Sequence, residues 1–138
     1  MGKKFCQSSY NRIDMNIPKQ VIDKAIKTAK ASNVIRGKVG ATIFTNSGHI
    51  ITSAHNAVML GKIEEEIFTI HAEEHATLKA LKMKAVERFG KLNILIVRWK
   101  PSSDILANAK PCRKCQYYLK KAGFRVFYTN EFGNIERL

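Results

Sequence analysis

Four residues in two short motifs have the types and the spacing of a metal-dependent hydrolytic centre. The first motif is His71-Ala72-Glu73, and the second is Pro111-Cys112-Arg113-Lys114-Cys115. A catalytic zinc ion commonly takes three protein ligands and leaves its fourth tetrahedral position to water. One histidine and two cysteines satisfy that count, so His71, Cys112 and Cys115 are the predicted ligands of Zn²⁺.

Glu73 is the predicted proton-transfer group of this centre. It lies two residues after His71, which makes it sterically poor as a further ligand but keeps it close to the ion. Zinc lowers the pKa of a bound water toward ~7, and a carboxylate beside that water can move its protons. One metal ion and one glutamate are therefore sufficient for a hydrolytic deamination.

Each motif alone is weakly specific. A His-x-Glu triplet arises often by chance, and a C-x-x-C pair suits zinc, redox chemistry or neither. A thioredoxin-like redox role is disfavoured because the pair is not set in an early strand-helix unit. A non-catalytic zinc domain that binds a partner or nucleic acid would not require Glu73, so the combination favours an enzyme.

Helices are expected to begin at both motifs. Residues 69–84 mix apolar residues with good helix formers, and Pro111 opens a helix that ends at Gly123, with at least one of Tyr117 and Tyr118 expected in the core. A helix start favours the charged form of a cysteine. Between the two helices, residues 92–99 form a nearly continuous apolar run, typical of a strand buried on both faces.

The remaining elements follow from periodicity and turn residues. A helix is predicted over residues 18–32, and two strands over 39–44 and 49–54 form a hairpin around an Asn and a Gly. Residues 58–68 and 100–110 are predicted connections. A strand over 124–128 follows, and the chain end adds a short fifth strand. This order implies a mixed sheet covered by helices.

Composition predicts one folded domain in a reducing compartment. The chain has 138 residues, 45% of them hydrophobic and 25% charged, which suits a single domain over residues 16–138 preceded by a basic arm at 1–15. No apolar run approaches the ~18 residues that span a bilayer. Three cysteines are too few for a disulfide scaffold, so we expect the cytoplasm. The formal charge of +13 favours encounters with polyanions, including nucleic acid.

With both motifs in place, the sequence resembles the cytidine and deoxycytidylate deaminase superfamily, whose signature combines H-x-E with P-C-x-x-C. The resemblance runs from about Val39 to Tyr128, which is most of the chain. It implies a three-layer α/β/α fold with a mixed five-stranded sheet flanked by helices. It also implies a homo-oligomer.

The resemblance implies a role for each matched residue. The three predicted ligands would hold zinc, and Glu73 would move protons between the attacking water, the ring nitrogen and the departing amine. The backbone amide of Ala72 would face the base carbonyl. Asn56 matches a position where the family often has an asparagine that contacts a sugar hydroxyl, although a turn role suits it equally well.

The substrate is less constrained than the chemistry. Small tetrameric cytidine deaminases usually carry cysteine in place of His71, and the spacer between Glu73 and Pro111 is long for several branches that carry histidine. The leading expectation is deamination of cytosine in cytidine, deoxycytidine or deoxycytidylate, with release of ammonia. A base in RNA or single-stranded DNA, favoured by the charge, and a free purine base are the alternatives. The candidate phosphate contacts are Arg98, Lys100 and Arg113.

Overall fold

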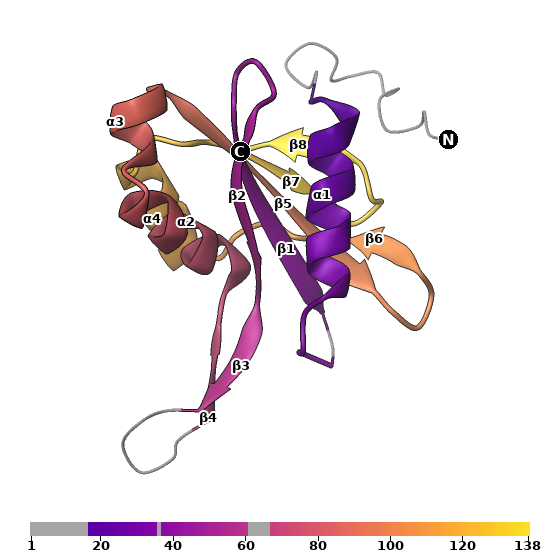
Figure 1. Cartoon of the computed structure of the whole chain (residues 1–138). Helices are drawn as coiled ribbons and strands as arrows, with labels where there is room; N and C mark the ends of the chain where they lie inside the picture. Colours follow the sequence, from indigo (N-terminus) through magenta and orange to yellow (C-terminus); the bar gives the residue numbers. More distant parts are fainter. Residues whose placement is uncertain (1–16, 36, 61–66) are drawn as a thin grey trace.

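The architecture is built on a mixed sheet with helices on both faces (Figure 1). The computed structural model describes residues 17–35, 37–60 and 67–138. Within these residues the main sheet has six strands, which are β1 (Lys38–Thr45), β2 (Ile50–His55), β5 (Leu92–Lys100), β6 (Ile105–Ala107), β7 (Arg125–Thr129) and β8 (Ile135–Arg137). Five of them lie in the order β2-β1-β5-β7-β8, the sixth, β6, pairs with β5, and only the β5–β7 pair is parallel.

The helices form one layer on each face of this sheet. Helix α1 (Lys19–Lys30) covers one face, and α2 (Ala72–Lys82), α3 (Ala85–Phe89) and α4 (Arg113–Lys121) lie on the other (Figure 1). The predicted three-layer α/β/α fold class with a mixed sheet is thus confirmed, although the main sheet has six strands among the described residues and not the predicted five, because β6 forms within a predicted connection. No helix among the described residues is long and apolar enough to cross a membrane.

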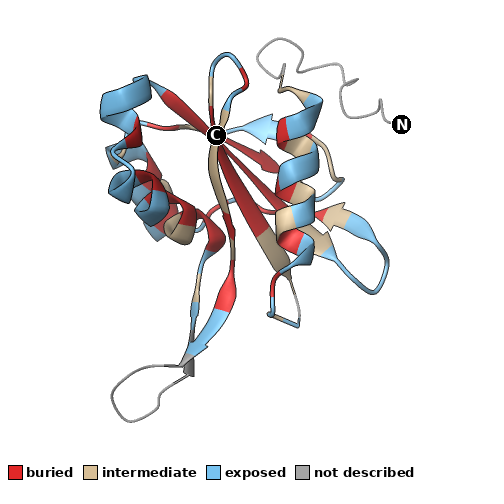
Figure 2. Ribbon diagram, in the orientation of Figure 1, coloured by how far each residue is buried: buried red, intermediate tan, exposed pale blue. Residues whose placement is uncertain are grey.

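Strand β5 separates the two halves of the core, as its apolar run predicted. Ile94 and Ile96 pack in the cluster beneath α2 and α4, whereas Leu95 and Val97 pack in the cluster beneath α1, and all four are fully buried. Successive side chains of a strand point to opposite faces, so a strand covered by helices on both sides must be apolar throughout. Figure 2 shows the same arrangement, with buried residues concentrated in the sheet and exposed ones on the outer helix surfaces.

Two predicted connections contain short strands. The prediction of a loop over residues 58–68 is wrong at its ends, where β3 (Ala57–Leu60) pairs with β4 (Ile67–Ile70) in a separate two-stranded sheet that extends away from the core (Figure 1). Each strand has four residues, too few for a sequence period to distinguish strand from loop. Strand β6 likewise lies inside the predicted connection 100–110. It pairs with residues 98–100 at the end of β5, whereas β7 pairs with residues 93–96 of the same strand.

The helices differ from their predicted forms in detail. The predicted helix over residues 69–84 begins only at Ala72, because residues 69 and 70 belong to β4, and it ends at Lys82 before α3 begins. Tyr117 and Tyr118 are both exposed, so the expectation that one is a core residue is wrong; α4 buries Cys115 and Leu119 instead. The predicted basic arm, residues 1–15, lies outside the described residues.

Gly40 of β1 allows α1 to approach the sheet closely. A Cβ atom at this position would lie 2.5 Å from the Ala25 carbonyl oxygen and 2.6 Å from the Ala29 amide nitrogen. Both neighbours are helix backbone, so they cannot move as a flexible side chain would. We expect Gly40→Ala to lower the free energy of unfolding in urea by about 1–3 kcal/mol, as overpacking does. The control is alanine in place of the exposed Lys91, which should change the free energy of unfolding by less than about 0.5 kcal/mol. Equal stability of the two variants would contradict the close packing of α1 against Gly40.

Candidate metal centre

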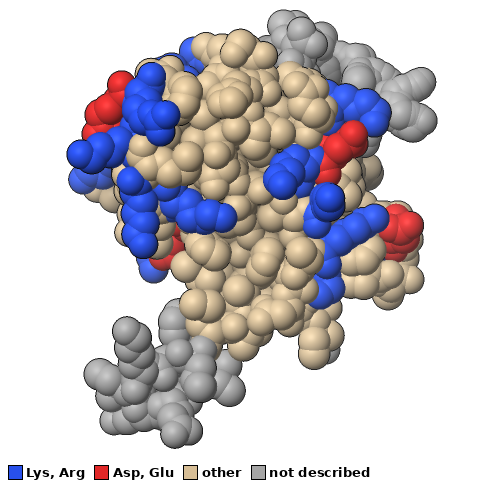
Figure 3. Space-filling model, viewed as in Figure 1, with Lys and Arg blue, Asp and Glu red and all other residues tan. Residues whose placement is uncertain are grey.

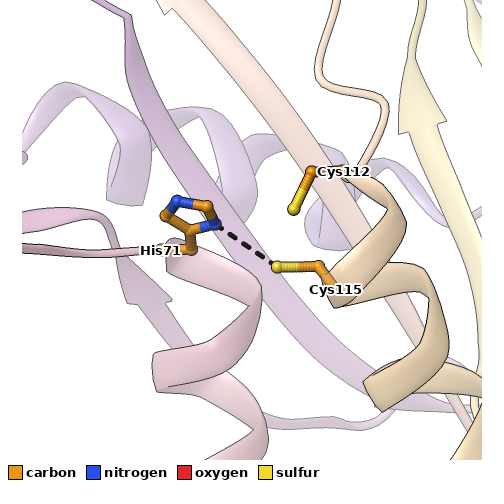
Figure 4. Close-up of side chains that lie close together, drawn as sticks. All are labelled: His71, Cys112 and Cys115. Atoms are coloured by element: carbon orange, nitrogen blue, oxygen red, sulfur yellow. Dashed lines mark hydrogen bonds between the residues drawn. The ribbon is translucent and has the colours of Figure 1, made fainter.

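The two motifs lie at the starts of two neighbouring helices. His71 is the N-cap residue of α2, directly after β4, and Cys112 is the N-cap residue of α4. Both have extended backbone conformations, and Cys115 follows as the third residue of α4. The helix predicted over residues 69–84 would include His71; in the structure His71 lies one residue before the first residue of α2, and its side chain points toward α4 (Figure 4).

The three predicted ligands converge on one point. A ring nitrogen of His71 and the sulfur atoms of Cys112 and Cys115 all lie within 4.8 Å of one another, and His71 Nδ1 lies 3.3 Å from Cys115 Sγ (Figure 4). In a tetrahedral zinc site, metal–ligand bonds of 2.0–2.3 Å place the ligand atoms roughly 3.5–3.8 Å apart. The residues present therefore fit a zinc ion with three protein ligands and an open fourth position.

The donor atoms of the centre also suit a metal cation. Burial raises the pKa of the Cys115 thiol, and the nearby Glu73 and Cys112 raise this pKa further. A thiolate is the form that binds metal, so a bound cation would have to lower this pKa and release the thiol proton. Thiolate and imidazole ligands together favour zinc over harder cations such as Mg²⁺. Because His71 and Cys112 are exposed, the centre is open to solvent on their side.

Glu73 lies beside the ligands as a buried acid. It is the second residue of α2, and only 6% of its surface is exposed. Burial raises the pKa of the Glu73 carboxyl, and the neighbouring His71 acts in the opposite direction. A raised pKa lies closer to neutral pH than that of an ordinary carboxyl, which suits an acid-base role.

The two predicted substrate contacts differ in their freedom to bind a ligand. Ala72 is fully buried at the first position of α2, where a backbone N–H has no partner within the helix. Asn56 is buried, and its amide already has three protein partners. Its oxygen accepts from Val39 N at 2.9 Å and Ser32 Oγ at 2.7 Å, and its nitrogen donates to Gly37 O at 3.0 Å. Asn56 therefore ties the residue after β2 to the start of β1 and to the segment before it, with one amide hydrogen left for a ligand.

Among the three candidate phosphate contacts, the structure distinguishes Arg98. Lys100 and Arg113 are exposed, whereas Arg98 is half-buried and its Nε atom is buried without a hydrogen-bond partner among the described residues. Arg98 shares its face of β5 with Ile94 and Ile96, the face that α2 and α4 cover. It thus lies on the same side of the sheet as the helices that carry the metal ligands.

A cavity of about 260 Å³ lies between α2 and α4 and reaches the back of the centre. Its lining is mostly apolar and includes Leu78, Leu81 and Tyr118. It borders Glu73 and Cys115 but neither His71 nor Cys112, so it lies behind the ligands and away from their solvent-exposed side. Sequence reasoning missed this groove, which only the exposed leucines at positions 78 and 81 could have indicated.

Comparisons with known proteins agree with this geometry. A family profile described as the cytidine and deoxycytidylate deaminase zinc-binding region matches residues 15–130. Among solved structures, the apo form of the dCMP deaminase from cyanophage S-TIM5 matches with a TM-score of 0.58 and 24% sequence identity, over 81% of each chain. At this identity the likeness shows a shared fold. No curated protein sequence matches the chain.

Proposed function

The chain belongs to the cytidine and deoxycytidylate deaminase family, and from this premise we propose that its substrate is the cytosine base of a small nucleoside or nucleotide. It is a zinc-dependent hydrolytic deaminase. The convergence of His71, Cys112 and Cys115 beside the buried carboxyl of Glu73 carries the deaminase chemistry, and the family match supports cytosine as the base.

The proposed mechanism assigns each step to a side chain or backbone group of this chain. His71, Cys112 and Cys115 would hold the zinc ion, which when bound supplies a Lewis acid that activates water at neutral pH. Glu73 takes a proton from the water that adds to C4 of the base and delivers it to the ring nitrogen N3. It then carries the second proton of that water to the amine, so that the C4–N bond breaks and ammonia leaves.

The binding groups follow from their positions. The Ala72 amide donates to the base carbonyl, and the remaining amide hydrogen of Asn56 contacts a sugar hydroxyl. Arg98 offers a guanidinium without a carboxylate partner among the described residues, which suits the phosphate of a nucleotide. A nucleotide substrate is therefore favoured over a free nucleoside.

A substrate panel tests this proposal. Ammonia release is followed with cytidine, deoxycytidine, deoxycytidylate, guanine, adenosine and short oligonucleotides, each with and without a zinc chelator. We expect release from the cytosine compounds, fastest from deoxycytidylate, which the chelator abolishes and added zinc restores. Release from guanine or adenosine alone would contradict the proposal.

The formal charge of +13 favours binding of polyanions, so a base within RNA or single-stranded DNA is the second candidate substrate. Figure 3 shows Lys and Arg side chains in two groups on one face of the molecule, over α1 and over the helices on the other side of the sheet. Such surfaces bind the nucleic-acid backbone with an affinity that falls steeply as salt rises. Salt-sensitive binding and deamination of oligonucleotides would favour this candidate, and indifference to oligonucleotides would exclude it.

We also propose that the groove between α2 and α4 binds a second copy of the chain. Leu78 and Leu81 are 50% and 56% exposed there, although large apolar side chains at the rim of a groove usually find a partner. Glu74 on α2 and Lys121 on α4 line opposite sides of the groove. In a twofold interface each contact occurs twice, so an opposite-charge pair of Glu74 with Lys121 of the other copy would be formed on both sides of the axis.

Leu81→Glu should convert this dimer to a monomer, because it places two carboxylates in the apolar interface. Light scattering after size-exclusion chromatography measures the mass of the particle in solution. Ile105→Glu is the matched control, since Ile105 is comparably exposed on β6, outside the groove. A monomeric wild type, or the same dimer in the Leu81 variant, would contradict the interface.

A further inference from the structure

A second cavity lies at the opposite end of the sheet from the metal centre. Its volume is about 200 Å³, and it is lined by Asn93 at the start of β5 and Arg125 at the start of β7. The segment that leads to Cys112 instead contacts the end of β7, where Ala109 donates to Thr129. Phe44 and Phe127 line the cavity from the core beneath α1, so it also opens on the other face of the sheet.

Two asparagines hold Arg125 at the wall of this cavity. The amide nitrogen of Asn93 donates to Asn46 Oδ1 at 3.0 Å and to the Phe44 carbonyl at 3.3 Å, and Asn93 is 4% exposed. Arg125 donates through one terminal nitrogen to the side-chain oxygens of Asn46 and Asn93. Its other N–H groups have no hydrogen-bond partner among the described residues, so a positioned guanidinium keeps donors for a ligand.

Arg137 brings a second positive charge to the same cavity. Its guanidinium lies over the ring of Phe127, 5.9 Å from the ring centroid. Within the described residues the only ion pair is Lys19–Asp23 on the surface, so neither arginine is neutralised there by a carboxylate. Pro18, at the start of α1, completes the wall, and the first turn of that helix has no acidic residue and no side-chain cap.

We propose that this cavity binds a phosphoryl group, either as inorganic phosphate or as a phosphate of a nucleotide. Guanidinium groups pair with phosphate oxygens through two parallel hydrogen bonds, and two such groups match the charge of the anion. The uncapped start of α1 adds a favourable dipole. The site is remote from the metal centre, so its existence does not depend on the substrate proposed above.

Titration of the full-length chain by nuclear magnetic resonance tests this site. Inorganic phosphate is added at constant ionic strength, and the backbone amides of Asn46, Asn93 and Arg125 are followed together with the arginine Nε–H signals. We expect saturable shifts confined to these groups. Arg137→Gln should weaken binding at least tenfold, because it removes one charged, bidentate partner. Arg125→Lys should do the same if the variant keeps the wild-type spectrum elsewhere.

Arg88→Gln is the matched control, because Arg88 also lies over an aromatic ring, that of Phe89, but does not line this cavity. It should leave the affinity unchanged. A parallel titration with adenosine triphosphate identifies the source of the phosphate: tighter binding than inorganic phosphate assigns the site to nucleotides, and equal binding assigns it to the free ion. Shifts spread over the whole basic surface, or equal affinity in wild type and the Arg137 variant, would overturn the proposal.

Discussion

Replacing Glu73 with glutamine is expected to lower the rate of ammonia release at least about a hundredfold while zinc stays bound. Glutamine has the shape of glutamate but cannot take up and release a proton. The side chain is buried beside the ligands, so solvent is a poor substitute for the missing proton carrier. The measurement is kcat with the best cytosine substrate, together with zinc content by mass spectrometry of the same preparation.

The adjacent acid provides the control for this experiment. Glu74 follows Glu73 in the first turn of α2, but its side chain is only half-buried, whereas that of Glu73 is buried. Glu74→Gln is the same substitution at the next position of the helix. It should change kcat by less than about threefold. If Glu73→Gln keeps more than half of the wild-type kcat, proton transfer by this residue is refuted.

Cys115→Ala is expected to remove the metal and the activity together. The variant would leave one histidine and one cysteine at the site, fewer than the three protein ligands that catalytic zinc sites commonly have. We expect the zinc content to fall from about one ion per chain to less than about a tenth. Loss of the ion should also lower the melting temperature, because a metal that binds only the folded state stabilises it.

Cys6→Ala is the control for cysteine chemistry in general, because Cys6 is the one cysteine of the sequence that belongs to neither motif. The Cys6→Ala variant should keep the zinc content and the activity of the wild type. Zinc retained at one ion per chain in the Cys115 variant would contradict the ligand set.

The sequence predicts the chemistry of this protein more completely than it predicts the local structure. Ligand types and the three-residue interval of the cysteines are fixed by the coordination of zinc, so the convergence of His71, Cys112 and Cys115 follows once two helix starts face each other. Strand β5 was equally predictable, because a strand covered on both faces must be apolar throughout.

The elements that sequence reasoning missed are short or depend on distant partners. The pairing of β3 with β4 involves four residues on each strand, below the length at which a period is visible. The hydrogen bonds of Asn56 reach Ser32, Gly37 and Val39 across the fold, and no local pattern indicates them. The exposure of Tyr117 and Tyr118 reflects the short α4, where Cys115 and Leu119 already fill the buried face.

X-ray absorption spectroscopy at the zinc edge tests the central claim most directly, because it reports the atoms bound to the ion in the intact protein. The expected spectrum has two sulfur neighbours at about 2.3 Å and two nitrogen or oxygen neighbours at about 2.0–2.1 Å, from His71 and a solvent molecule. Cys112→Ser should lower the sulfur count to one. A wild-type spectrum without sulfur, or with four sulfur neighbours, would contradict a catalytic zinc centre built from these three residues.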